Sequence, residues 1–175
     1  MLKDVLKFFG NSLLILLSVF FIGSIVHFGF FELSEVNGRS MEDTFNDRDI
    51  IVIDKVTLLA KEPQRGQVVS AFGEFEGLLV VKRIIGLPGE TVIIRRGEVL
   101  IRDTEGNEFV LDEPYLTKQA DTFPELGNEF FYPIADDEYF LMGDSREHST
   151  DSRNYGAVTR DNVVGIVRSI SFLND

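Results

Sequence analysis

The sequence contains no cysteine. This absence excludes disulfide bonds, thiolate metal sites and a cysteine nucleophile, although it leaves the redox compartment open. Basic residues are also few, because 17 Lys and Arg stand against 29 Asp and Glu and give a net charge of −12 at pH 7. Without a dense basic cluster to contact phosphates, we expect no nucleic-acid partner.

Histidine occurs only at His27 and His148. A Ser-His-Asp protease is therefore poorly supplied, since His27 lies in an apolar stretch and is more simply a neutral residue near a membrane interface. The hydrolase elbow Gly-x-Ser-x-Gly is missing too, because Met41 and Glu42 follow Ser40. Serine hydrolase chemistry in this chain would need another base.

Apolar residues, by contrast, are plentiful. They make up 44% of the 175 residues and include 16 phenylalanines, enough to fold one main domain with its own core. We find no internal repeat and no low-complexity segment. The chain should therefore fold as one main unit.

Residues 8–31 form an uncharged stretch long enough to span a bilayer. Lys3 and Lys7 precede it, and Glu32 and Glu35 follow it. The positive-inside rule then predicts a cytoplasmic N-terminus (1–7), a transmembrane anchor (8–31) and an extracytoplasmic domain (32–175). A cleavable signal is the alternative, but its apolar core is usually about 7–15 residues with a small-x-small cleavage site, so we favour the anchor.

Past residue 32, short β-rich runs alternate with turn residues, which predicts a mainly β domain with antiparallel, barrel-like sheets. The runs are residues 50–53, 67–69, 78–85, 91–94, 99–101, 139–142 and 163–170. Residues 95–98 are typical of a hairpin tip. Residues 112–137 lack periodicity and predict a less regular excursion, whose acidic residues we interpret as solvated surface without a function.

Lys82 follows the apolar run 78–81 and precedes Arg83 and two isoleucines. A lysine can act as a base only when it is neutral, and apolar surroundings favour that form by lowering its pKa. In a strand, Lys82 and Arg83 point to opposite faces. The alternative, which the local pattern alone favours, is a Lys-Arg pair that ends an edge strand and protects it from aggregation.

Ser40 lies in the segment 37–40, which is equally typical of a turn or a helix cap. The polar run 143–156 directly follows an apolar segment and contains Asp144, Arg146, Asp151 and Arg153. Dense polar loops are commonly surface, but closely spaced Asp and Arg residues can also build a buried hydrogen-bonded scaffold. These patterns leave both interpretations open.

Taken together, these segments resemble the type I signal peptidases in the compact, single-anchor form typical of Gram-positive bacteria. The resemblance covers nearly the whole chain and rests on three ordered boxes, a strand and a short segment: Gly38-x-Ser40-Met41-x-x-Thr44, Val81-Lys82-Arg83-Ile-Ile-Gly86-Leu-Pro-Gly89, Tyr139–Gly156, Asp49–Lys55 and Asp112–Leu116. It implies a serine endopeptidase that cuts signal peptides from exported preproteins after small residues in an Ala-x-Ala-like pattern.

The resemblance also implies roles for single residues. Ser40 would be the nucleophile, Lys82 its base and Ser149 a hydroxyl that orients the lysine amine. Met41 would help form the pocket for the small side chain, and the Ser40 amide would supply one oxyanion donor. Many members carry a second donor where this chain has Gly38. The structural polar residues of the last box would be Asp144, Arg146, Asp151 and Arg153.

Such a mechanism needs no cofactor and no metal. The implied partners are preprotein signal peptides and the lipid bilayer, with the site outside the cytoplasm. A second hypothesis is a signal-peptidase-like assembly factor for surface structures such as pili, which would bind a partner in the secretion or pilus machinery and need little or no cleavage. Degenerate relatives of that kind can lose the dyad, and this chain retains both Ser40 and Lys82.

Two positions depart from the family pattern. Asp43 replaces the usual proline of the first box, and Arg48 stands where glycine normally precedes the aspartate. Losing the proline should loosen the loop after the nucleophile. If the Asp43 carboxylate lies near Lys82, it favours the ammonium form, which predicts a more alkaline optimum or a narrow substrate range.

Overall fold

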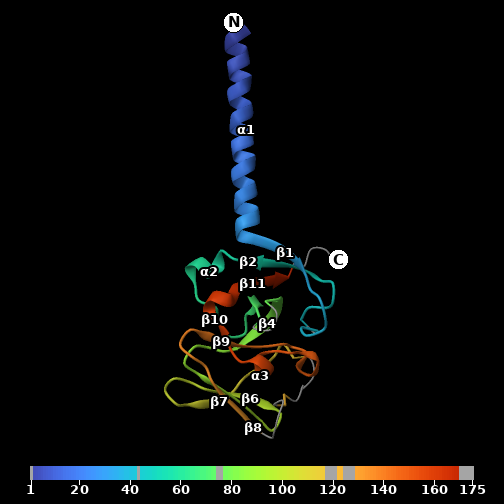
Figure 1. Cartoon of the computed structure of the whole chain (residues 1–175), viewed down its shortest axis with the longest axis vertical. Coiled ribbons are helices and arrows are strands. Elements are labelled where there is room, and N and C mark those ends of the chain that lie inside the picture. The colour runs from blue at the N-terminus through green and yellow to red at the C-terminus, as the bar shows by residue number, and fades with distance from the viewer. Residues whose placement is uncertain (1, 43, 74–76, 117–121, 124–128, 170–175) are drawn as a thin grey trace.

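The computed structural model describes residues 2–42, 44–73, 77–116, 122–123 and 129–169, without the side chains of 2, 4–6 and 25–28. Helix α1 (Leu2–Phe30) stands away from the rest of the molecule (Figure 1). Its segment Lys7–Ser24 has a mean hydropathy of 1.6 and is 0% buried, so it is long and apolar enough to cross a membrane. His27 belongs to this helix, but its side chain lies outside the described set.

After α1, the described residues form two antiparallel sheets. The seven-stranded sheet has the order β1-β2-β11-β3-β4-β9-β10, and the four-stranded sheet has the order β7-β6-β5-β8. The first contains β1 (Phe31–Glu35), β2 (Ile50–Asp54), β3 (Val68–Phe72), β4 (Leu79–Gly86), β9 (Glu138–Met142), β10 (Val158–Thr159) and β11 (Val163–Ser169). The second contains β5 (Thr91–Arg95), β6 (Glu98–Arg102), β7 (Glu108–Val110) and β8 (Glu129–Pro133).

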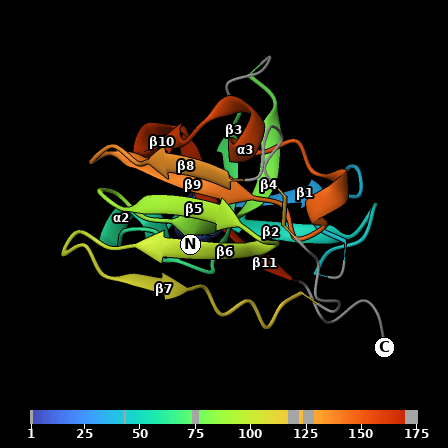
Figure 2. The same cartoon turned by 90° about the horizontal axis from the view of Figure 1, so that it is seen from below.

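Short helical turns connect some of these strands: α2 (Thr57–Ala60), η1 (Arg146–His148), α3 (Ser152–Tyr155) and η2 (Arg160–Asn162). Strands β1 and β2 and helix α2 lie nearest α1, whereas the four-stranded sheet lies at the opposite end (Figure 1). Seen from that end, β5, β6 and β8 lie in front of the seven-stranded sheet (Figure 2). The predicted mainly β, antiparallel fold is confirmed.

Each β-rich run of the sequence overlaps a strand, and the hairpin tip is also confirmed. Arg95 pairs with Glu98, while Arg96 and Gly97 have φ values of 54° and 83°. Positive φ at both central residues matches the twist that a two-residue hairpin requires. Strand β8 went unrecognised because it lies in the excursion 112–137, where Pro133 ends it at a sheet edge.

Separate apolar clusters hold the two sheets together and hold the first loop in place. Between the sheets, residues of β4 and β9 such as Ile85, Phe140 and Met142 pack against the inner faces of β5 and β6. A second cluster packs Met41 and Phe45, from the loop after β1, onto strands β2 and β11. Burying a side chain such as Met41 stabilises the fold by about 1.5–3 kcal/mol, so the loop that carries Ser40 is fixed to the sheet.

Arg48 has a φ of 72°, in the left-handed region that favours glycine. Its backbone is held there by an amide bond to the Val36 carbonyl at 2.8 Å. The position where the family pattern has glycine therefore keeps a glycine-like conformation. We expect Arg48→Gly to raise the free energy of unfolding by about 0.5–1 kcal/mol, because the penalty for a Cβ exceeds the added entropy of the unfolded chain.

Chemical denaturation of the full chain in detergent checks this prediction. Arg48→Ala is the matched control, since it removes the exposed guanidinium but keeps the Cβ. Equal stabilisation by both substitutions would attribute the effect to the lost charge and contradict the backbone argument.

Candidate active site

Ser40 and Lys82 meet although they are far apart in the sequence. The Lys82 ammonium nitrogen lies 2.6 Å from the Ser40 hydroxyl. Lys82 is on β4, pairs with Val69 of β3 and is 4% exposed, while Arg83 beside it is 8% exposed. Because both basic side chains are buried, the interpretation of a solvated pair at an edge strand is wrong.

Burial sets the charge state of Lys82. Removal from water disfavours the ammonium and lowers the pKa of Lys82 from 10.5 to about 8. Asp151 raises this pKa, Arg153 lowers it and Asp144 raises it, each with a smaller effect than burial. The arrangement therefore supplies a neutral amine, in contact with a hydroxyl, at mildly alkaline pH.

This pKa predicts how any reaction that uses Lys82 as a base depends on pH. The rate should rise about tenfold per pH unit below pH 8 and level off above it, because only the neutral amine accepts a proton. A profile of kcat/KM between pH 6 and 10 checks the prediction. A limb centred near 10.5 would show that burial does not tune the lysine.

The two side chains line a cleft of about 360 Å³. One wall comes from the segment after α1, including Val36 and Met41, and the other from residues 79–82 of β4. Met41 is therefore where a pocket residue is expected. Gly38 does not line the cleft; its φ is 98° and its amide donates to Asp47 at 2.7 Å.

Ser149 lies close to the pair, but the expected contact with Lys82 is not formed. Its buried Oγ has no hydrogen-bond partner among the described residues. Gly143 makes this approach possible, since a Cβ there would collide with the Ser149 hydroxyl and the Ser40 carbonyl. The role of Ser149 in orienting the lysine stays a prediction.

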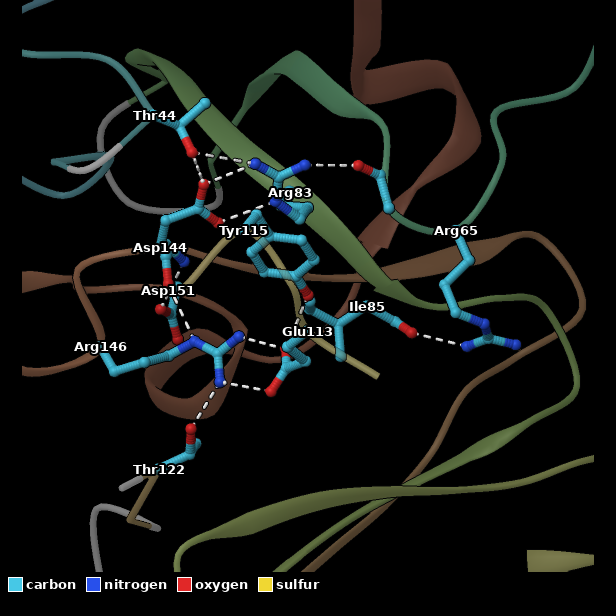
Figure 3. A network of polar contacts seen from close by, with 12 residues as sticks. Thr44, Arg65, Arg83, Ile85, Glu113, Tyr115, Thr122, Asp144, Arg146 and Asp151 are labelled. Atoms are coloured by element: carbon cyan, nitrogen blue, oxygen red, sulfur yellow. Dashed lines mark hydrogen bonds and ion pairs between the residues drawn. The ribbon is translucent and has the colours of Figure 1, made fainter. Parts of the chain in front are cut away.

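Next to the pair, Arg83 ties three segments together (Figure 3). Its guanidinium donates to both carboxylate oxygens of Asp144, at 2.8 and 2.6 Å, and to the Thr44 hydroxyl at 3.1 Å. It also lies 3.9 Å from the centre of the Tyr115 ring. The strand of Lys82, the loop after Ser40 and the loop after β9 are thereby joined through one buried cation.

Two further arginines brace the loop after β9. Arg146 forms an ion pair with Glu113 and donates to the Gly143 carbonyl at 3.1 Å (Figure 3). Arg153 pairs with Asp151 at 2.8 Å, and Asp151 accepts the Gly143 amide at 3.0 Å. Asp151 also caps α3. All four predicted polar residues of the last box thus lie in one hydrogen-bonded network.

Sequence reasoning assigned no role to Glu113, Tyr115 or Arg83. The interpretation of the acidic residues of 112–137 as solvated surface is wrong for Glu113, whose side chain is 11% exposed and pairs with Arg146. Burial and the Glu113 carboxylate raise the pKa of Tyr115, which donates to that carboxylate at 2.6 Å. The available signal was the need of buried arginines for carboxylate partners.

The two departures from the family pattern have different outcomes. Asp43, on which the prediction of a more alkaline optimum depends, lies outside the described residues. The Arg48 side chain is 83% exposed and lies 3.9 Å from Asp47, so it is a surface residue. Its effect acts through the backbone.

Comparison with known proteins places this geometry in a family. The family described as "Signal peptidase, peptidase S26" matches residues 8–172. The chain is 36% identical over 143 residues to "Signal peptidase I" of Bacillus amyloliquefaciens, covering 78% of this chain and 74% of that protein. It is 35% identical over 154 residues to "Signal peptidase I T" of Bacillus subtilis (strain 168), covering 85% and 77%.

A solved structure shows the same fold. The crystal structure of a signal peptidase I from Enterococcus faecalis V583 matches with a TM-score of 0.51 at 31% identity, covering 62% of this chain and 98% of that one. The family model spans most of the described domain, and the relatives exceed 30% identity over most of the chain. The chain therefore belongs to the signal peptidases of the peptidase S26 family, which are serine proteases.

Proposed function

We propose that this protein removes N-terminal signal peptides from exported preproteins with Ser40 as nucleophile and Lys82 as general base. The observation that carries the proposal is the 2.6 Å contact between the Ser40 hydroxyl and a buried lysine whose pKa is lowered to about 8. A turn serine and a structural lysine need neither this contact nor this burial. Together they form the activated nucleophile of a Ser/Lys hydrolase.

The reaction proceeds through an acyl-enzyme. Neutral Lys82 takes the proton from Ser40 as its Oγ attacks the scissile carbonyl carbon, and the resulting ammonium then protonates the leaving amine. The same amine activates a water molecule, which releases the acyl group and restores Ser40. No acceptor among the described residues binds the Ser40 amide, so this amide can donate to the oxyanion.

An extended peptide fits the cleft as an added strand. Arg83 and Ile84 of β4 pair with β9, but Leu79–Lys82 pair only with β3 within the described part of the chain. That edge faces the cleft and presents backbone groups that a substrate strand can bind. Met41 beside Ser40 limits the room next to the reacting carbonyl, so a small residue is expected before the cut.

The anchor places this chemistry at a membrane. The apolar α1 continues directly into β1, so the catalytic domain begins where the helix ends. Lys3 and Lys7 lie at one end of the apolar stretch, and Glu32 and Glu35 at the other. By the positive-inside rule, we infer that the cleft lies at the outer face of the membrane, where exported preproteins emerge.

Mapping the cleavage site tests the proposed specificity. The full chain in lipid nanodiscs is incubated with a preprotein that ends its signal peptide in Ala-x-Ala, and mass spectrometry identifies the new N-terminus. We expect one cut after the last alanine and loss of cutting when that alanine becomes phenylalanine. Equal cutting of both substrates would contradict the small-residue rule while leaving protease activity in place.

A further inference from the structure

Ser70 of β3 is a buried polar residue without an assigned role. It is 0% exposed and lies directly opposite Val81, the residue before Lys82. Its hydroxyl has no hydrogen-bond partner among the residues that the structure describes. An unpaired buried hydroxyl is unfavourable, and most buried hydroxyls in proteins find a partner.

The surroundings of Ser70 connect it with the substrate cleft. Ser70 lines that cleft together with Ser40, Lys82 and Met41. Directly paired residues of antiparallel strands share a face, so Ser70 and Val81 lie on the same side of the sheet. Around them, the apolar cluster of Val36, Met41, Val68 and Val81 forms the wall of the cleft. Ser70 is thus a single hydroxyl in the apolar floor of a peptide site.

We propose that Ser70 determines specificity by binding the hydroxyl of a serine or threonine in the substrate. The inference rests on the proposed function, because it requires a peptide in the cleft. The bound hydroxyl would pair with the Ser70 Oγ, which lacks a partner in the free protein. A site that offers a buried polar group discriminates against a ligand that leaves the group unpaired.

The register of an added strand indicates which substrate residue reaches Ser70. The last residue before the cut places its carbonyl at Ser40 and its side chain beside Met41. In an extended peptide, the next side chain on the same face belongs to the third residue before the cut. Ser70 lies on the strand next to β4, opposite Val81 rather than Lys82, and is displaced from the Ser40 end of the cleft. We assign it to this third position.

Peptide kinetics with the full chain in detergent test the proposal. Fluorogenic peptides carry alanine or serine at the third position before the cut and are otherwise identical. We expect the native enzyme to prefer the serine peptide by about 5-fold in kcat/KM, the usual value of one net hydrogen bond. Ser70→Ala should reduce this ratio to about 1 or below. The control is Ser169→Ala, on the exposed end of β11, which should keep the native ratio.

Thermal unfolding separates specificity from a structural role. Because the Ser70 hydroxyl makes no internal hydrogen bond among the described residues, Ser70→Ala should melt at or above the native temperature. Cleavage without a serine preference, a preference at the last residue only, or a ratio unchanged in Ser70→Ala would each overturn the proposal for Ser70 alone. No cleavage of any peptide by the native chain would overturn the proposed function with it.

Discussion

Replacing Lys82 with methionine is expected to lower kcat/KM for peptide cleavage by about 10³-fold or more at pH 8. The substitution keeps the length and apolar stem of the side chain but removes the nitrogen that lies 2.6 Å from the Ser40 hydroxyl. Loss of a general base that activates a nucleophile has effects of this size. Lys82→Arg should be equally inactive, because a guanidinium does not deprotonate in this pH range.

Stability measurements show whether the loss is chemical. The pKa of Lys82 is about 8 in the folded protein and 10.5 in the unfolded chain, so the unfolded state binds more protons between these values. The lysine therefore disfavours folding below about pH 8, and this cost fades as the pH rises towards 10.5. Lys82→Met should melt at or above the native temperature at pH 7. A variant that is inactive because it unfolds would contradict the assignment of Lys82 as the base.

Replacing Asp144 with alanine should have the largest effect on stability, a loss of about 3–5 kcal/mol in the free energy of unfolding. The carboxylate is 1% exposed and pairs with Arg83, whose side chain is 9% exposed. Without Asp144, the Arg83 guanidinium stays buried with only neutral partners at Thr44 and Gly66. The loop of Ser40 and the strand of Lys82 would lose their shared anchor, so activity should fall as well.

The matched control is an exposed pair of the same kind. Arg102 also donates to a carboxylate through two nitrogens, at 2.9 and 2.5 Å, but the Arg102 and Glu108 side chains are 42% and 31% exposed. Glu108→Ala should cost less than about 1 kcal/mol. Chemical denaturation monitored by circular dichroism measures both variants. Similar losses for the two would show that burial does not set the strength of the Arg83–Asp144 pair.

Local periodicity predicted most of the fold because most strands are short, apolar and bounded by turn residues. The hairpin at Arg96-Gly97 and the anchor helix α1 were identified for the same reason: each depends on neighbouring residues. Strand β8 was missed because its neighbours in the sheet, not its own sequence, determine it.

The site could be predicted only in part. Ser40 and Lys82 were identified through the family motifs, since nothing local distinguishes them from a turn serine and an edge lysine. The contacts of Arg83 with Asp144 and of Arg146 with Glu113 join residues distant in the sequence, so spacing does not reveal them. Ser70 gives no signal in the sequence, because its importance comes from the cleft formed by other segments.

The most direct test of the central claim is the cleavage of a preprotein in membranes by the native chain, Ser40→Ala and Lys82→Ala. The account predicts that the native chain releases the mature protein and that neither variant does, while all three reach the membrane in equal amounts. Equal processing by all three would contradict the Ser40–Lys82 mechanism. Failure of the native chain to cleave, combined with support of surface assembly, would point to the assembly-factor hypothesis instead.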